Sequence, residues 1–187
     1  MMKLRYFLPF LALSATLRTT AAEPPRLVVQ IVVSSMRAED LNRYADNFSD
    51  EGFLRLVRGG TFYPESHYDY LHTSTPVSLA TLTTGAMPST HGVIGARWRD
   101  YVENDAVELI AGRKGPGPYN LIAPTLAEAL LQHEPGAKAV SVATEAMSAI
   151  IMAGHGGEAF WLDSARCGWE TSPYYAAEVP EWVARSN

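Results

Sequence analysis

The sequence predicts an α/β fold in which helices flank a mainly parallel sheet. The first observation is the run of apolar, largely β-branched residues over 27–33, which is typical of a central strand covered on both faces. The second is the alternation of strand-like and helix-like segments that follows it. The third is an ordinary globular composition, because 47% of the 187 residues are hydrophobic and 19% are charged. This length corresponds to about one domain.

Capping and turn residues set the expected bounds of the later elements. Ser49 is suited to cap a helix over 50–58, which Gly59-Gly60 would end. Thr75 before Pro76 is typical of a helix start with threonine at the N-cap, and this helix would end near 84–85. The other predicted elements are a short strand over 61–66, a loop over 112–118, a helix over 125–133, a strand over 138–143, a helix over 144–152, a strand over 159–162 and a partly helical segment over 173–185.

The first 22 residues have the pattern of a secretory signal peptide. Lys3 and Arg5 precede an apolar stretch over 6–17 that is too short for a stable membrane anchor, and the small residues over 20–22 suit cleavage. The alternative is a buried N-terminal helix. The signal predicts an exported protein, periplasmic or secreted, with no membrane anchor. Its mature part, 23–187, would form the α/β domain.

Charge and cysteine content exclude several classes of protein. Fifteen Lys and Arg residues against twenty Asp and Glu residues give a net charge of -5. A nucleic-acid-binding protein needs a clustered basic surface, so we expect no nucleic-acid partner. Cys167 is the single cysteine, which excludes an internal disulfide and any cysteine-rich metal site.

Thr75 is a candidate functional residue because of its expected place in the fold. In open α/β sheets, ligands bind where loops leave the carboxyl ends of strands and lead into helices, and 34–37 and 72–76 are such segments. A hydroxyl at a helix start lies beside free backbone N–H groups and the positive end of the helix dipole, which attract anions. It could attack phosphorus if a base or a metal lowered its pKa. The alternative is that Thr75 only caps the helix.

Other polar motifs favour structural roles. His67, His72 and His91 are five and nineteen residues apart, which matches no local metal motif, so we predict partly buried structural histidines. The Gly-His-Gly-Gly segment over 154–157 lacks the residues and spacing of a nucleotide-binding loop and is predicted to be a turn.

Several short blocks of the sequence are weak signals singly, but their order and spacing along the chain form a specific pattern. The first is the run over 27–33 with Met36-Arg37 after it, and the later blocks include Thr75. They lie at 52–56, 60–62, 75, 84–85, 88–93, 98, 120–121, 125–126, 140–142, 153–155, 161–163, 171–175 and 180–183. In this order the chain, from about residue 26 onward, resembles the alkaline-phosphatase superfamily. It is most similar to the periplasmic single-threonine alkaline phosphatases of the type I phosphodiesterase/nucleotide pyrophosphatase branch.

The resemblance implies an alkaline-phosphatase-like fold and metal-dependent hydrolysis of phosphate esters. The substrate would be a small phosphate ester, and the enzyme a phosphomonoesterase or a phosphodiesterase. In that family two zinc ions activate a threonine, which is phosphorylated before a metal-bound hydroxide releases phosphate. Thr75 falls at the position of this nucleophile.

The sequence departs from the family at four site positions. Ser34 stands where the family has a metal-binding aspartate, and serine is a poor zinc ligand. Ser78-Leu79 replaces a frequent Gly-His pair, and neither Ala96 nor Arg97 is the asparagine that contacts phosphate. The Lys-x-Arg pair that grips phosphate would fall at 143–145, where no basic residue stands. The family's other metal ligands would lie downstream of this chain, so we expect it to be incomplete at its C-terminus and to bind zinc poorly.

Three hypotheses follow from these features. The chain could be the N-terminal piece of a larger exported phosphate-ester hydrolase, in which case the 187-residue chain alone would be inactive. It could instead be a degenerate, non-catalytic relative that serves as an exported binding or structural protein. The third is an exported α/β binding protein that shares only the scaffold.

Overall fold

Helix α7 (Ala146–Ala153) and strand β4 (Glu158–Asp163) lie at the centre of the larger of two units. The computed structural model describes residues 25–186. The two units span 1–43 and 44–187. The predicted signal peptide, 1–22, and the first residues of the predicted domain over 23–187 lie outside the described residues.

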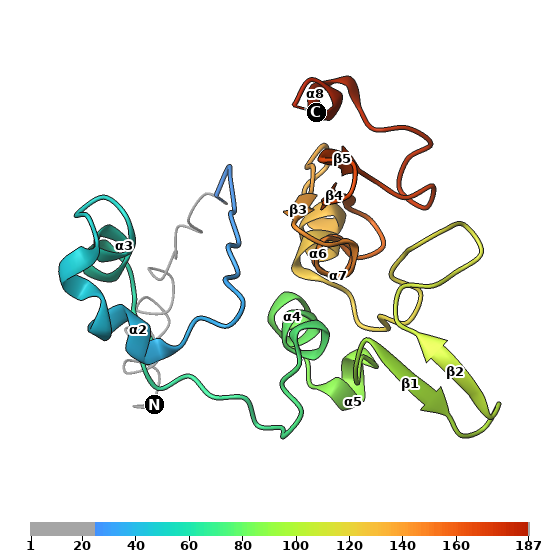
Figure 1. Ribbon diagram of the computed structural model, residues 1–187, viewed down its shortest axis with the longest axis horizontal. Helices are drawn as coiled ribbons and strands as arrows, with labels where there is room; N and C mark the ends of the chain where they lie inside the picture. Colours follow the sequence, from blue (N-terminus) through green and yellow to red (C-terminus); the bar gives the residue numbers. More distant parts are fainter. Residues whose placement is uncertain (1–24, 187) are drawn as a thin grey trace, which may run out of the picture. The chain divides into compact units, whose positions relative to one another are not determined.

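The second unit combines helices with two small sheets (Figure 1). In the larger sheet, β4 runs parallel to β3 (Val140–Ala143) on one side and antiparallel to β5 (Gly168–Glu170) on the other. The expected α/β class, with helices flanking strands, is confirmed, and the strand pairing is mixed. The other elements are the hairpin of β1 (Arg97–Asp100) and β2 (Asp105–Glu108), a short 3₁₀ helix (Ala45–Asn47), and helices α3 (Phe53–Gly59), α4 (Thr75–Thr84), α5 (Pro88–His91), α6 (Leu126–His133) and α8 (Glu181–Ala184).

Helix α7 is buried on two sides, and the core forms around it. Its Ile151 side chain belongs to a cluster with residues of α4, among them Val77 and Leu79. Its Ile150 side chain belongs to a second cluster that includes Trp161 of β4. The sequence of α7, AMSAIIMA, is apolar around most of the helix, which is typical of a helix that is covered rather than exposed on one face.

The start of α6 is tied to the turn that follows α7. Thr125 and Glu128 form a capping box: the Thr125 N–H donates to Glu128 Oε2 at 2.9 Å, and the Glu128 N–H donates to Thr125 Oγ1 at 3.2 Å. Glu128 Oε1 also lies 3.2 Å from His155 Nδ1. The predicted turn over 154–157 is confirmed, and Gly154 allows it to approach the capping box closely.

The C-terminal end of α7 is closed by Tyr175. Its hydroxyl donates to the carbonyl oxygen of Gly154 at 2.9 Å and lies 3.4 Å from that of Ile150. Burial raises the pKa of Tyr175 well above its ordinary value, so the phenol stays protonated and remains a donor. The carbonyl of the C-cap residue Gly154 therefore has a fixed partner here, whereas the Ile150 carbonyl already accepts the Gly154 N–H at 3.0 Å.

The four elements predicted over 125–162 are confirmed, and their bounds shift by one or two residues. The predicted loop over 112–118 contains no helix or strand, and the segment over 173–185 is helical only in α8. The expected helix start at Thr75 is correct to one residue. Ser74 is the N-cap, and Pro76 lies in the first turn.

The predicted central strand over 27–33 is wrong in this structure. These residues adopt no regular secondary structure, and Leu27 and Ile31 are 77% and 78% exposed. A strand that is buried on both faces needs a hydrogen-bonded neighbour and a layer on each face, and no described strand pairs with this segment. The described part of the first unit otherwise contains α2 (Ala38–Arg43), which has no buried residue.

Two further expectations near α3 are wrong. The segment over 61–66 is not a strand, because Pro64 has no N–H to donate to a sheet and the Ser66 hydroxyl donates to the Tyr63 carbonyl in a turn. Ser49 does not cap α3. Gly52 is the N-cap instead, since its N–H donates to the Ser49 carbonyl in a turn before the helix begins.

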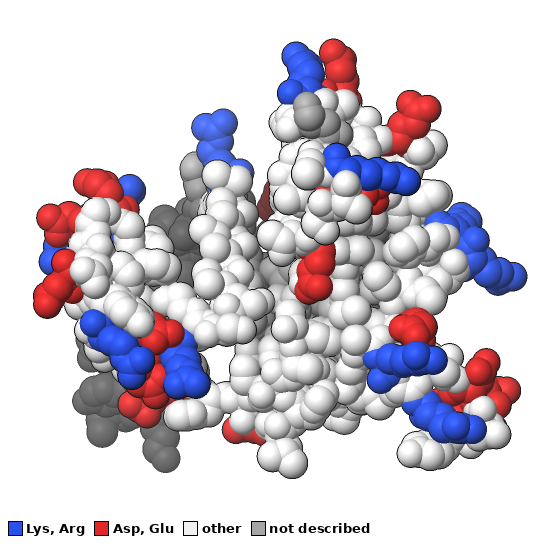
Figure 2. Space-filling view, viewed as in Figure 1, with Lys and Arg blue, Asp and Glu red and all other residues white. Residues whose placement is uncertain are grey.

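Over residues 25–186, none of the helices has the length and apolar character that a membrane span requires. On the face shown in Figure 2, basic and acidic side chains are interspersed and do not form a large patch of one sign.

Replacing Gly154 with alanine should destabilise the fold strongly. Gly154 has φ +63° and ψ −155°, and an added Cβ would lie 2.5 Å from Glu128 Oε2 and 2.6 Å from Thr125 Oγ1. We expect a loss of more than about 2 kcal/mol in the free energy of unfolding, measured by urea denaturation.

Gly136→Ala is the matched control. Gly136 also has a positive φ, +86°, but nothing lies within 4 Å of an added Cβ. Backbone strain alone should cost about 1 kcal/mol. Equal losses in the two variants would contradict the close approach at Gly154.

Candidate functional site

Thr75, the first residue of α4, is exposed at an open helix start. Ser74 is the N-cap, but its side chain makes no capping hydrogen bond. Ser74 Oγ is instead buried with no partner among the described residues. The Thr75 hydroxyl likewise has no hydrogen bond to the described part of the chain, which leaves it available to a ligand. Pro76 has no N–H, so the free backbone donors of this first turn are those of Thr75 and Val77, which have no partner within the helix and give the site a positive electrostatic character.

The rest of α4 is held by its buried face and its C-cap, and this fixes the position of Thr75. Val77 and Ala80 are almost completely buried, and Leu79 is 5% exposed. At the other end Gly85 adopts the left-handed conformation with φ +65°, and its N–H donates to the Thr81 carbonyl. The helix is therefore held by its buried face and its C-cap, while its first residue stays in solvent.

A partly buried hydrogen-bonded network lies on α4 one to two turns beyond Thr75. The Tyr70 hydroxyl donates to Thr81 Oγ1 at 2.8 Å, and His91 Nε2 lies 3.1 Å from the same oxygen. The Val93 N–H donates to His91 Nδ1 at 3.1 Å. Because Nδ1 accepts, Nε2 carries the ring proton of the neutral histidine and donates to Thr81. The network connects the loop before α4, the helix itself and α5.

His91 confirms one of the three histidine predictions. It is completely buried, and desolvation lowers its pKa below the ordinary value of 6.5. His67 and His72 were also expected to be partly buried, but both are exposed on the loop before α4, so this expectation is wrong for them. His67 lies 3.6 Å from Glu65 on the surface. The functional grouping of Tyr70 and Thr81 could not be predicted from the sequence, because their spacing belongs to no local motif.

The positions at which the chain departs from the family have structural contacts of their own. Leu79 lies in the core. Arg97 on β1 pairs with Glu108 on β2 at 3.1 Å across the hairpin. Glu145, which precedes α7, accepts a hydrogen bond from the Ser148 hydroxyl at 2.7 Å. Ser34 lies in the first unit, at a turn in which the following residue, Ser35, has φ +61°.

Metal-ligand side chains do not gather among the described residues. Over 25–186, no group of three or more His, Cys, Asp or Glu residues is placed to hold a metal ion. The described residues therefore do not by themselves fit the zinc site that the resemblance implies, since zinc sites use three or four such ligands.

Comparison with known proteins shows the family to which the chain belongs. The family model for type I phosphodiesterase / nucleotide pyrophosphatase matches residues 28–184. The chain therefore belongs to this family, within the alkaline-phosphatase superfamily, as the ordered blocks of its sequence indicate.

Individual relatives agree with this assignment. The chain is 33% identical, over 91% of its length, to alkaline phosphatase PafA of Elizabethkingia meningoseptica. It is 32% identical, over 92% of its length, to a Myroides odoratus protein named calcium-transporting ATPase, and 28% identical to alkaline phosphatase PhoV of Synechococcus elongatus. The crystal structure of wild-type PafA matches with a TM-score of 0.82 and 30% identity over 87% of this chain. The chain spans about a third of the length of these relatives, 34% for PafA.

The stability of the fold should depend on pH through His91. Its pKa is lowered in the folded state, so the unfolded chain takes up a proton first as the pH falls through about 6.5. The contribution of His91 to the free energy of unfolding should therefore be complete at neutral pH. It should decrease at lower pH, by at most about 1.4 kcal/mol per pH unit. Urea denaturation at several values between pH 5 and pH 8 measures the slope.

His91→Gln is the control, because glutamine keeps an N–H donor for Thr81 but does not titrate. The variant should lose part of the slope between pH 7 and pH 5. An unchanged slope would show that His91 does not contribute to the pH dependence.

Proposed function

We propose that the protein is an exported hydrolase of small phosphate esters and that Thr75 supplies the attacking hydroxyl. Membership of the type I phosphodiesterase / nucleotide pyrophosphatase family supports the class of reaction. The observation that supports the role of Thr75 is its position. It is an exposed residue without a hydrogen-bond partner in the described chain, and it is the first residue of a helix whose buried face is fixed in the core.

The proposed reaction is a displacement at phosphorus. The Thr75 oxygen forms a bond to phosphorus while the bond to the ester oxygen breaks, and the leaving alcohol takes up a proton. Water then cleaves the phosphothreonine and releases inorganic phosphate. The open start of α4 would hold the phosphate oxygens, because backbone N–H groups and the helix dipole both favour an anion there. The rigid helix would keep the hydroxyl aligned with the phosphorus atom.

Activation of the hydroxyl needs a group that the described residues do not provide. A threonine hydroxyl has almost no alkoxide at neutral pH and must lose its proton to a base or a metal-bound group. Zinc supplies this activation in the family that the chain resembles. The described residues do not gather a set of zinc ligands. The 187-residue chain alone should therefore be inactive.

A second candidate function is binding without catalysis. Ser34 favours it, because a hydroxyl at that position replaces a strong metal ligand by a poor one. The contacts of Leu79, Arg97 and Glu145 within this chain also support it, since these side chains have structural partners and need no substrate. Such a protein would still attract an anion at the start of α4 but would not turn it over.

Thr75→Val should abolish hydrolysis by the exported protein as its native host makes it. Valine keeps the shape of threonine but lacks the hydroxyl, so we expect a loss of at least about a thousandfold in kcat for p-nitrophenyl phosphate. Thr75→Ser should retain part of the activity, because it keeps an oxygen nucleophile.

Thr73→Val is the matched control, since Thr73 is an exposed threonine two residues before Thr75 and lies on the loop that precedes the helix. It should leave kcat within about twofold of the unchanged protein. Undiminished turnover by Thr75→Val would exclude Thr75 as the nucleophile. If the unchanged exported protein hydrolyses nothing but binds inorganic phosphate, the non-catalytic alternative holds.

The 187-residue chain, produced by itself, should not hydrolyse p-nitrophenyl phosphate with or without added zinc. The reason is that its described residues hold no set of metal ligands near any nucleophile. A colorimetric assay for p-nitrophenol checks this. Zinc-dependent hydrolysis that Thr75→Val removes would contradict it.

A further inference from the structure

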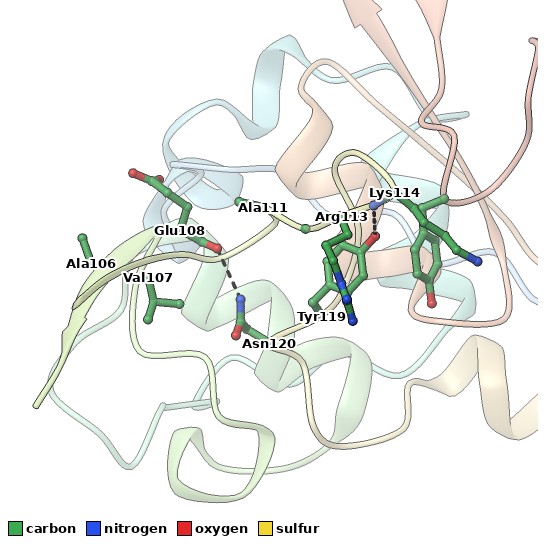
Figure 3. Close-up of a pocket in the computed structure, with 10 residues that line it drawn as sticks. Ala106, Val107, Glu108, Ala111, Arg113, Lys114, Tyr119 and Asn120 are labelled. Carbon is green, nitrogen blue, oxygen red and sulfur yellow. Dashed lines mark hydrogen bonds between the residues drawn. The ribbon is translucent and has the colours of Figure 1, made fainter. Parts of the chain in front are cut away.

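A surface pocket of about 700 Å³ lies beside the β1–β2 hairpin, and Thr75 is not among the residues that line it. Figure 3 shows the pocket, with strand β2 on one side and the loop after it on the other. Aromatic and basic side chains of this loop line it together. The lining residues are Ala106, Val107, Glu108, Ala111, Gly112, Arg113, Lys114, Tyr119, Asn120 and Tyr174.

The loop over 112–118 is held in a defined shape around the ring of Tyr119. A Cβ added at Gly112 would overlap this ring, so only glycine allows the backbone to pass there. The Lys114 N–H donates to the Tyr119 hydroxyl at 3.2 Å, and the Gly117 N–H donates to the Ile110 carbonyl at 2.8 Å. The Ser172 hydroxyl donates to the Pro116 carbonyl. The backbone that carries the basic side chains is thus fixed at both ends.

The charges of the pocket favour an anion. Arg113 and Lys114 are adjacent on the loop, and neither forms an ion pair with the described residues over 25–186. The carboxylate of Glu108 in the pocket is already paired with Arg97 at 3.1 Å. The pocket therefore presents two uncompensated positive charges on a chain whose net charge is -5.

Next to these charges lies an aromatic surface. The rings of Tyr119 and Tyr174 meet edge to face, with centroids 5.3 Å apart and an interplanar angle of 82°. Tyr119 is 39% exposed although its neighbours hold it in place. An exposed aromatic ring with a fixed orientation can stack against a planar ligand without further ordering, which lowers the entropic cost of binding.

We propose that this pocket binds a small aryl anion, in which a phosphate, phosphonate or carboxylate group is joined to a planar ring. Arg113 and Lys114 would bind the anionic group, because a charged donor and an anion form the stronger class of hydrogen bond. Tyr119 would contact the ring. The proposal concerns binding at a place whose residues do not include Thr75, so it does not depend on the proposed hydrolysis.

Titration calorimetry with phenylphosphonate on the full chain tests the proposal. Methylphosphonate, which has the anion alone, and benzyl alcohol, which has the ring alone, are the ligand controls. Phenylphosphonate should bind at least about tenfold more tightly than either, and more weakly as salt is added. Equal affinities for the two phosphonates would overturn the aromatic part of the proposal on the unchanged protein, without any variant that could misfold.

Lys114→Gln should weaken phenylphosphonate binding about tenfold. Lys138→Gln is the matched control, because Lys138 is an exposed lysine outside the pocket and its replacement removes the same charge from the chain. Equal effects of the two variants would show attraction by net charge alone and would overturn the site. If Lys114→Gln binds phenylphosphonate as tightly as the unchanged protein does, the anion binds elsewhere and the pocket is excluded.

Discussion

The burial of α7 on two sides is the constraint on which the described structure depends. Its Ile151 side chain packs with α4, and its Ile150 side chain packs with residues of β4. Removing this helix from the core would separate the sheet from the helix that carries Thr75. The exposed hydroxyl thus owes its fixed position to apolar contacts on the buried face of α4, because this face cannot shift without opening the first cluster.

The elements that could be predicted from the sequence are those whose signals are local. The helix over Leu126–His133 begins with a Thr-x-x-Glu capping box, and α4 ends at a glycine that adopts a positive φ. The segment over 27–33 carries an equally strong pattern, but a strand forms only when another strand pairs with it. The short hairpin of β1 and β2 was missed, because its charged strands, RWRD and DAVE, show no apolar alternation.

The candidate site could be predicted only in part for the same reason. Thr75 was found because a Thr-Pro pair before an apolar segment marks a helix start. The network of Tyr70, Thr81 and His91 joins residues from a loop, a helix and the next helix, so no spacing along the chain indicates it. The pocket beside Tyr119 depends on the shape of a glycine-containing loop, and its sequence predicted a loop but not the ring that the loop encloses.

The carboxylate of Glu128 has two partners, the N–H of Thr125 and the imidazole of His155, and it leaves no room for a side chain at Gly154. Each of these contacts restricts which residue types the other positions tolerate. A larger residue at 154 would displace the carboxylate, and a shorter acid at 128 would leave both the helix start and the imidazole without a partner. These four positions should therefore vary together among natural homologues, as one coupled set rather than as four independent sites.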